Sequence, residues 1–280
     1  MKNSTQTATA AAKRKVSNIA LIVGTFSLLL MSVQANGETT DAEPMTGWSS
    51  EFGAALLSNT EYQGASSYDI MAFPYFDFRY FDEKGEKYFA NVPQGFGAYL
   101  YREQLDNGMQ SRVFASIAPA FVDRDPDDFD GLNTFGMGVQ ARLGWELERG
   151  PFAVSAVVGQ ELGAGHEGLT VDLSADWRTR LGERSFLSVG PTVRWGDDTY
   201  MENLYGVTSL ESANTGLAAF QASSGFESVG VQGVLGVPVV GEWRLTTVLQ
   251  VSRLLGDSAD TSLTSEPNQA FFFTALTRRF

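Results

Sequence analysis

The feature that most restricts how this chain can fold is a strict alternation of apolar and polar side chains in long runs. In residues 133–148, Leu143 and Trp145 belong to an apolar set of alternate positions, and Arg142 and Glu146 belong to the polar set between them. The same pattern recurs in residues 109–122, 168–181, 185–196 and 242–255. A period of two sustained over ten or more residues is typical of β-strands that have one apolar and one polar face.

The length of these runs favours strands that cross a membrane. They extend over 12 to 16 residues, whereas strands of soluble sandwiches are about five or six residues long and a tilted membrane strand needs about 9 to 11. The Arg, Asp and Glu residues of the polar faces suit a water-filled lumen better than a packed core. Trp145, Trp177, Trp195 and Trp243 fall near the ends of their runs, where the aromatic girdles of membrane barrels lie.

The sequence therefore predicts an all-β fold, a transmembrane antiparallel up-and-down β-barrel of about twelve strands. Short turns alternate with longer links along the chain, as periplasmic turns alternate with outer loops in such barrels. The run at 86–91 is the weakest, and a barrel of ten strands is the alternative. The predicted strands are residues 46–58, 68–82, 86–91, 95–104, 109–122, 133–148, 152–163, 168–181, 185–196, 219–237, 242–255 and 270–280.

The N-terminal 35 residues have the composition of a secretory signal peptide. A basic segment, Lys13-Arg14-Lys15, precedes an apolar one, IALIVGTFSLLLM, and small residues up to Ala35 suit cleavage there. An uncleaved anchor is the alternative, although the apolar segment is short for a membrane-spanning helix. We expect residues 1–35 to be the signal peptide, 36–45 a short N-terminal segment and 46–280 the barrel, placed in the outer membrane of a Gram-negative cell.

Charge and cysteine content exclude several classes of protein. The full chain has a net charge of −13, and removal of residues 1–35, which hold four basic and no acidic residues, changes it to −17. Such an acidic protein is a poor candidate for binding nucleic acid, because that binding depends on Lys and Arg neutralising phosphates. The chain has no cysteine, which excludes thiol catalysis, disulfides, thiolate metal sites and lipid attachment to a cysteine.

The only histidine, His166, is the one candidate for catalysis. It lies in GAGHEG on a predicted outer loop, next to Glu167. A hydrolase needs a nucleophile within hydrogen-bonding reach of a base and a third group that orients the base, and no sequence pattern supplies such a set. A solvated loop histidine is the favoured interpretation, and an outer-membrane hydrolase centred on His166 is the alternative.

The acidic segment DRDPDDFDG raises the question of calcium binding. Asp123, Asp125 and Asp127 have the spacing of the first ligands of a calcium loop, but Asp128 stands where a glycine is needed and Thr134 where a glutamate closes the site. A solvated acidic loop is favoured, and a weaker hypothesis is that its carboxylates share divalent ions with lipopolysaccharide phosphates. The sequence thus predicts no catalytic residue, no cofactor site and no metal site.

The longest link, residues 197–218, is more apolar than a loop in solvent should be, since it includes Tyr200, Leu204 and Tyr205. Residues 209–213, SLESA, can begin a short helix. Two alternatives remain open. The link folds inward as a plug, which is slightly favoured, or it presents a surface to a partner.

Several segments together resemble the MipA/OmpV family of outer-membrane proteins. They are EYQGASSYDIMAFPYFDFRYFD, DDTYMENLYGVTSLESANTGLAAFQASSGFESVGV and EWRLTTVLQVSRLLGDSADTSLT. The resemblance extends over about residues 48–280, and the pair YGVTSLESA and RLLGDSAD is its most specific part. The chain departs from the family at Thr261, where Ser is frequent, at Leu263, where Pro is expected, and at Arg278, where an aromatic residue is frequent.

The resemblance implies a non-enzymatic outer-membrane barrel. The name-giving member is a scaffold that brings a murein lytic transglycosylase, MltA, together with a penicillin-binding protein in peptidoglycan remodelling, and other members are associated with adhesion or osmotic response. The implied partners are outer-membrane lipid and lipopolysaccharide, the barrel-assembly machinery and these murein enzymes. The alternative functions are a small-solute channel and an outer-membrane protein of adhesion or osmotic response. The inward Arg142, Arg178 and Arg194 would narrow the lumen of a channel.

The C-terminal segment FFFTALTRRF has the character of a closing strand. A barrel must pair its last strand with its first, here near Trp48, to remove the free edges. Phe280 resembles the terminal aromatic signal that the barrel-assembly machinery reads, and it is the one functional residue that the sequence predicts.

Overall fold

The computed structural model describes residues 46–280 apart from 107, 121–123, 125–130, 136–137 and 164. The predicted signal peptide and the segment 36–45 lie outside the described residues. Twelve strands follow one another along the chain: β1 (Gly47–Thr60), β2 (Tyr68–Asp82), β3 (Gly85–Asn91), β4 (Gly95–Gln104), β5 (Gln110–Ala120), β6 (Gly138–Arg149), β7 (Phe152–Glu161), β8 (Leu169–Arg180), β9 (Phe186–Gly196), β10 (Gly225–Pro238), β11 (Trp243–Leu254) and β12 (Asn268–Arg279).

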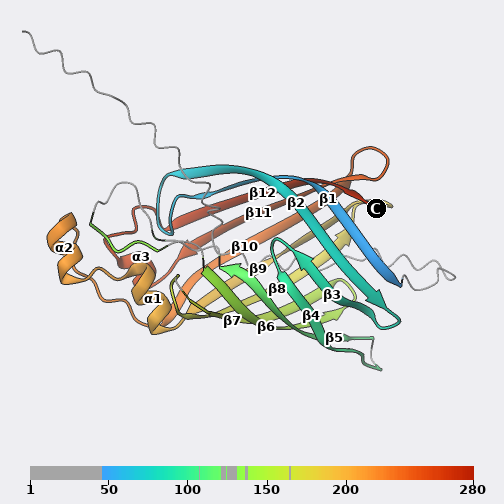
Figure 1. Ribbon diagram of the computed structural model, residues 1–280, viewed down its shortest axis with the longest axis horizontal. Coiled ribbons are helices and arrows are strands. Elements are labelled where there is room, and N and C mark those ends of the chain that lie inside the picture. Colours follow the sequence, from blue (N-terminus) through green and yellow to red (C-terminus); the bar gives the residue numbers. More distant parts are fainter. Residues whose placement is uncertain (1–45, 107, 121–123, 125–130, 136–137, 164) are drawn as a thin grey trace, which may run out of the picture.

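The strands form one closed barrel in which each pairs antiparallel with its neighbours in sequence. Closure comes from β1 and β12, which pair from Glu51 opposite Arg279 to Ser58 opposite Phe272. The all-β fold and the strand number of twelve are therefore confirmed, including the weak run that became β3. The β2–β3, β4–β5, β6–β7, β8–β9 and β10–β11 turns, which are short, lie at the end of the barrel that holds the C-terminus, and the longer links lie at the opposite end (Figure 1).

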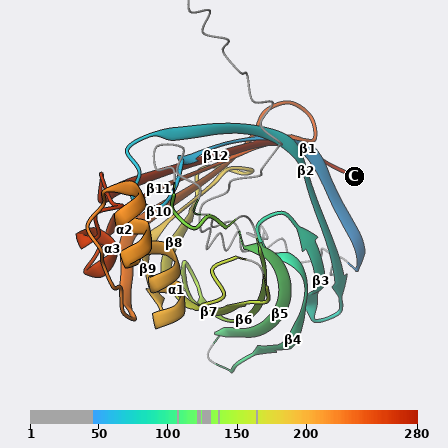
Figure 2. The same ribbon diagram turned by 60° about the vertical axis from the view of Figure 1, so that its left-hand side comes forward.

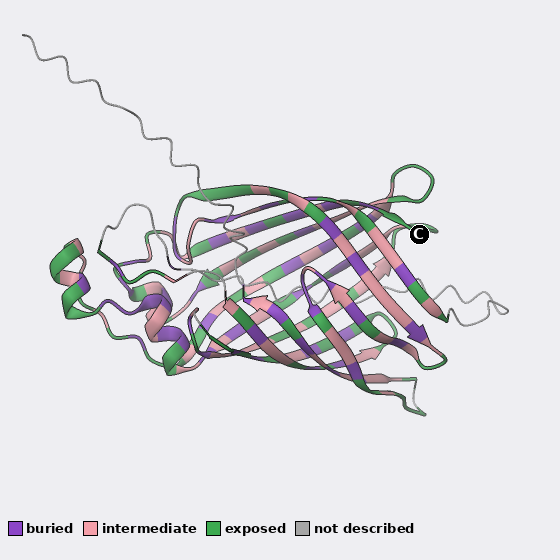
Figure 3. Ribbon diagram, viewed as in Figure 1, coloured by how far each residue is buried: buried purple, intermediate pink, exposed green. Residues whose placement is uncertain are grey.

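Burial alternates along the strands as the period of two requires (Figure 3). On β6, Val139, Leu143 and Trp145 are 42 to 54% exposed and face outward, whereas Gln140 and Glu146 are buried and face the lumen. An outward apolar belt of this kind is what a bilayer requires of a barrel. No helix in the described part of the chain is long and apolar enough to span a membrane.

The expectation of a polar lumen is wrong for one side of the barrel. The lumen faces of β1, β2 and β10–β12 pack together through an apolar cluster. Its buried members are Ala55, Leu57, Tyr75, Val234, Val248, Phe271, Phe273 and Ala275. The C-terminal run FFFTAL is apolar on both faces for this reason, since Phe272 and Leu276 face outward while Phe271, Phe273 and Ala275 pack inside.

The shortness of β3 leaves part of β2 paired on one side only. Residues 77–82 of β2 pair with β3, but 70–76 pair with β1 alone among the described residues. Pro74 lies within this segment. Proline has no N–H to donate, and it is found in sheets at such edges.

Two predicted strands begin later than expected, at Gly138 and Gly225 instead of at 133 and 219. In the first case Leu132 packs with Val207 and Leu263, and the N–H of Asn133 donates to Glu211. Leu132 and Asn133 therefore contact the other links at this end of the barrel, in a group of residues that we call the long-loop cluster, and do not extend the sheet.

The start of β10 is delayed because its backbone donors are taken by acidic side chains. The N–H groups of Ala222, Ser223 and Ser224 donate at 2.7 to 2.8 Å to the carboxylates of Glu202, Asp257 and Asp198, respectively. With these donors engaged, the residues cannot join the ladder, and Phe220 forms only an isolated bridge with Val207.

Three short helices, α1 (Asp198–Tyr205), α2 (Ser209–Thr215) and α3 (Asp257–Asp260), lie at the long-loop end. The predicted helix at 209–213 is confirmed as α2, whose capping box joins Thr208 and Glu211. The sequence prediction missed α1 and α3. Asp197 caps α1 by accepting from the N–H of Tyr200 at 2.8 Å.

The C-terminal residue extends the β1–β12 ladder. The N–H of Phe280 donates to the carbonyl of Ser50 at 2.9 Å, its ring meets Phe52 at 6.0 Å between centroids, and the Arg278 guanidinium lies 5.0 Å from the same ring. The side chain is nevertheless 67% exposed. So exposed a ring contributes modestly to stability, about 1 kcal/mol.

We predict that deletion of Phe280 lowers outer-membrane assembly strongly while hardly changing the stability of barrel that is already folded. The residue is proposed to act as an assembly signal, and its packing in the folded state is slight. Heat-modifiable migration of membrane fractions measures assembly, and urea unfolding of refolded protein measures stability. Phe280→Tyr, which keeps the aromatic ring, is the matched control and should assemble normally. Normal assembly of the deletion would refute the role.

Candidate functional site

The half of the lumen near the short turns is filled by side chains. Phe89, Tyr99 and Phe114, from β3, β4 and β5, pack edge to face with centroids 5.7 to 5.9 Å apart. Two strand glycines make room for these rings. A Cβ at Gly97 would lie 2.3 Å from the Phe89 ring, and one at Gly144 would lie 2.1 Å from the Phe114 ring.

Ion pairs occupy the polar side of the lumen. Arg112 of β5 contacts Glu146 at 2.7 Å and Glu148 at 2.9 Å, both on β6. Arg178 of β8 contacts the same Glu148 at 3.1 Å. This ion pair connects β8 with β6, which are not neighbours in the barrel. Tyr99 adds a hydrogen bond to Glu146 at 3.3 Å. The predicted inward orientation of Arg178 is confirmed.

The β3–β4 turn, residues 92–94, reaches into the lumen. Val92 packs against the apolar cluster of β1, β2 and β10–β12. On the opposite wall, Arg142 of β6 donates to the carbonyl of Pro93 at 2.9 Å and to Gln140 at 2.8 Å. The turn thus contacts both sides of the barrel. This inward position was not predicted from the sequence, because a three-residue turn carries no pattern of its own.

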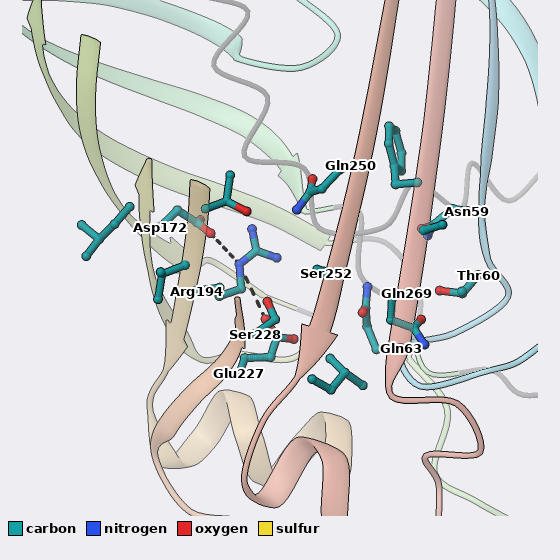
Figure 4. Close-up of a pocket in the computed structure, with 16 residues that line it drawn as sticks. Asn59, Thr60, Gln63, Asp172, Arg194, Glu227, Ser228, Gln250, Ser252 and Gln269 are labelled. Carbon is teal, nitrogen blue, oxygen red and sulfur yellow. Dashed lines mark hydrogen bonds and ion pairs between the residues drawn. The ribbon is translucent and has the colours of Figure 1, made fainter. Parts of the chain in front are cut away.

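Beyond this turn, toward the long loops, the lumen contains a chamber that is lined by β1 and β8–β12 (Figure 4). Half of the sixteen lining residues are uncharged and polar, namely Asn59, Thr60, Gln63, Thr192, Ser228, Gln250, Ser252 and Gln269. Three are charged, Asp172, Arg194 and Glu227, and five are apolar, Leu173, Val193, Leu254, Ala270 and Phe271.

Arg194 is the group of the chamber whose position is fixed by two charged partners. Its Nε donates to Asp172 at 2.6 Å and lies 3.7 Å from Glu227, so the side chain is held between two carboxylates. Figure 4 shows its guanidinium directed into the chamber. Nη1 and Nη2 make no hydrogen bond to a residue that the structure describes, which leaves donors available to a ligand.

The helix α1 packs on the rim of the chamber. Tyr200 and Tyr205 are fully buried, and both hydroxyls donate to Glu227, at 2.8 and 2.6 Å. Leu204 packs with them against Leu254, at the end of β11. The link 197–218 therefore folds against the rim near β8–β10, to one side of the opening (Figure 2), and does not enter the lumen as the slightly favoured plug would.

His166 is buried, so the prediction of a solvated histidine is wrong. The side chain is 1% exposed, and it lies beneath α1 with its ring 4.8 Å from that of Tyr200. Nδ1 accepts from the N–H of Gly168 at 3.2 Å and lies at the same distance from Glu161. The backbone carbonyl of His166 accepts from the side-chain amide of Asn203 of α1. Glu161 is an acid beside the histidine, but none of these partners is a serine or threonine hydroxyl that the histidine could activate, so the contacts do not form the set that a hydrolase centred here would need.

Burial, together with the smaller effect of the positive charge of Arg194, lowers the pKa of His166 to about 4. The neutral ring fits its contacts, because Nδ1 can accept from Gly168 only when it carries no proton. This histidine therefore helps to seat the β7–β8 link under α1 and acts as a structural group.

The long-loop cluster contains one further buried charge pair. Arg124 donates to the carbonyls of Asn203 and Gly206, both at 2.8 Å, and to Glu211 at 3.2 Å. It ties the β5–β6 link to the helical link between β9 and β10. Asp123, Asp125, Asp127 and Asp128 lie outside the described residues. Within the described ranges, no group of three His, Asp or Glu side chains is arranged to hold a metal ion.

Comparison with known proteins gives one family and several barrels. The family described as MltA-interacting protein MipA matches residues 52–280. Among solved structures, an outer membrane channel from Pseudomonas putida F1 is similar at 12% identity and a TM-score of 0.42, over 88% of this chain and 100% of that one. The outer membrane channel DcaP of Acinetobacter baumannii gives 9% and 0.36, over 85% and 100%. The comparison with curated proteins found no match.

We predict that His166 stays neutral in the folded protein down to about pH 5. Because its folded pKa of about 4 lies below the ordinary value of about 6.5, the unfolded chain binds the proton more tightly, and stability falls as the pH drops from about 7 to 4. The full loss is on the order of 3 kcal/mol. As the only histidine, it gives a single imidazole signal in the NMR spectrum of labelled protein. Titration of that signal near pH 6.5 in the folded state would contradict the burial, and the urea-unfolded chain is the control.

Proposed function

This chain belongs to the family of MltA-interacting proteins, MipA, and on that basis we propose that it is a non-enzymatic scaffold of the outer membrane. In this role it holds a murein lytic transglycosylase and a penicillin-binding protein together during peptidoglycan remodelling. Murein lies on the periplasmic side of the membrane. The partners would therefore meet the end of the barrel that carries the short turns, which face the periplasm in bacterial outer-membrane barrels.

The occupied lumen is the observation that carries this proposal against the alternative of a channel. The β3–β4 turn contacts both walls through Val92 and Pro93, and below it lie the Phe89 ring cluster and the Arg112 ion pairs. A small solute would have to displace paired charges and packed rings to pass, and separating a buried charge pair costs several kcal/mol. Protein binding on the outside of the barrel needs no such rearrangement.

The turn between β10 and β11 offers a specific docking point at the short-turn end. Val239 and Val240 are 57 and 68% exposed at its tip. The carbonyl of Gly241 accepts from Arg184 of the β8–β9 turn at 3.1 Å, which connects the two turns. The two exposed valines lie beside polar groups that the hydrogen bond from Arg184 to Gly241 keeps in place. An apolar centre with a polar rim is common at protein interfaces.

We predict that the purified barrel is electrically silent in planar bilayers. A lumen closed by the β3–β4 turn and by Arg112 with Glu146 should give no reproducible unit conductance. Removal of residues 92–94 with a direct join of β3 to β4 should raise leakage, because it takes away the turn that touches both walls. A stable unit conductance of the unmodified protein would favour the channel alternative over the scaffold.

We predict that replacing both valines, V239S together with V240S, reduces copurification of murein enzymes from detergent extracts by about tenfold. The substitution removes the apolar tip and leaves the strands unchanged. Leu210→Ser is the matched control, because this residue is 71% exposed on α2 at the opposite end. Absence of any transglycosylase or penicillin-binding protein above the level found with an unrelated barrel would refute the scaffold role.

A further inference from the structure

We propose that the chamber at the long-loop end of the lumen is a binding site for a neutral saccharide. The chamber is separate from the short-turn surface of the proposed scaffold, and it faces the end at which outer loops emerge (Figures 1 and 4). The inference rests on the hydrogen-bonding groups, the charge and the aromatic ring that line it.

The uncharged polar groups of the chamber have unused hydrogen-bonding capacity. Oε1 of Gln269 is buried and has no partner among the described residues. Gln250 and Ser252 lie on β11, next to the strand β12 that carries Gln269. Their side chains also form no hydrogen bond to any residue in the described ranges. A buried polar group without a partner costs free energy, which a ligand or bound water recovers. Amides and hydroxyls both donate and accept, as sugar hydroxyls do.

These groups lie next to an aromatic ring through the sheet register. Ser252 is opposite Gln269 and Gln250 is opposite Phe271 in the β11–β12 ladder, and one further pair, Val251 with Ala270, separates them. Side chains directly opposite each other in an antiparallel ladder have Cβ atoms about 4.5–5.5 Å apart. The wall therefore presents two planar amides beside one ring. A sugar ring, which has a C–H face and a rim of hydroxyls, matches this combination.

Charge in the chamber disfavours both polyanions and simple cations. Arg194 is flanked by Asp172 and Glu227, so the three together carry a formal charge of −1. Glu227 already accepts from two tyrosine hydroxyls and is not free to hold a cation. The Nη groups of Arg194 then act as fixed donors toward a neutral acceptor, such as a hydroxyl or ring oxygen.

The test is calorimetric titration of the detergent-solubilised full barrel with maltotriose, with triacetylchitotriose and with tripolyphosphate. We expect saturable binding of at least one trisaccharide and none of tripolyphosphate. Gln250→Leu and Ser252→Ala should each weaken binding by about tenfold, because each removes one hydrogen-bonding group from the wall. A neutral oligosaccharide released from lipopolysaccharide forms a further arm, which separates a membrane-attached sugar from a free one.

The matched control is Ser116→Ala. Ser116 is a buried lumen residue on β5, and its hydroxyl also lacks a partner among the described residues, but it does not line the chamber. This variant should bind trisaccharide within about twofold of the unmodified protein. Absence of binding to all three sugar probes, binding of tripolyphosphate in their place, or equal losses in the chamber and control variants would each overturn the proposal. None of these outcomes depends on the murein partners.

Discussion

The pairing of backbone N–H and C=O groups inside a hydrocarbon layer is the constraint on which most of this structure depends, and residues 70–76 of β2, which pair on one side only, are an exception among the described residues. A lone strand cannot satisfy it, and a sheet satisfies it only when its first and last strands meet, as β1 and β12 do from Glu51 to Ser58. A closed barrel has an outward face, which contacts lipid, and an inward face, which lines the lumen, and the two faces require side chains of opposite polarity. The outward face must be apolar along its length, and everything polar in the strands is directed into one narrow lumen.

That lumen explains why so many charged residues are buried in this protein. Glu146 is fully buried, but Arg112 and Tyr99 supply its partners, so the cost of its desolvation is offset by contacts made in the same space. Arg178 extends the set across β7 to Glu148. Ion pairs that link strands two apart brace the cross-section of the barrel. The apolar side, with Phe273 and Tyr75, fills the remaining width by packing.

The strands were predicted well from the sequence because the period of two is a local pattern that does not depend on which other residues each side chain contacts. It failed where side chains from distant segments decide the backbone. The late start of β10 depends on Glu202, Asp198 and Asp257 reaching its N–H groups, which no local pattern reports. A signal for α1 was present, since Asp197 precedes the helically spaced Tyr200 and Leu204. The chamber could not have been foreseen, because its lining comes from six strands whose alignment only the register gives.

The two ends of the barrel are chemically distinct, and this separates their functions. The long-loop end has a chamber whose polar groups are held by buried contacts such as Tyr205 with Glu227, and the short-turn end has exposed valines on a turn. Between them lies a packed lumen, in which Val92 and Pro93 contact opposite walls. Effects of substitutions at sites far apart with no shared partner add nearly independently. A sugar bound at one end can therefore influence a protein at the other only through the strands themselves, and a twelve-stranded barrel braced by ion pairs resists such a change of shape.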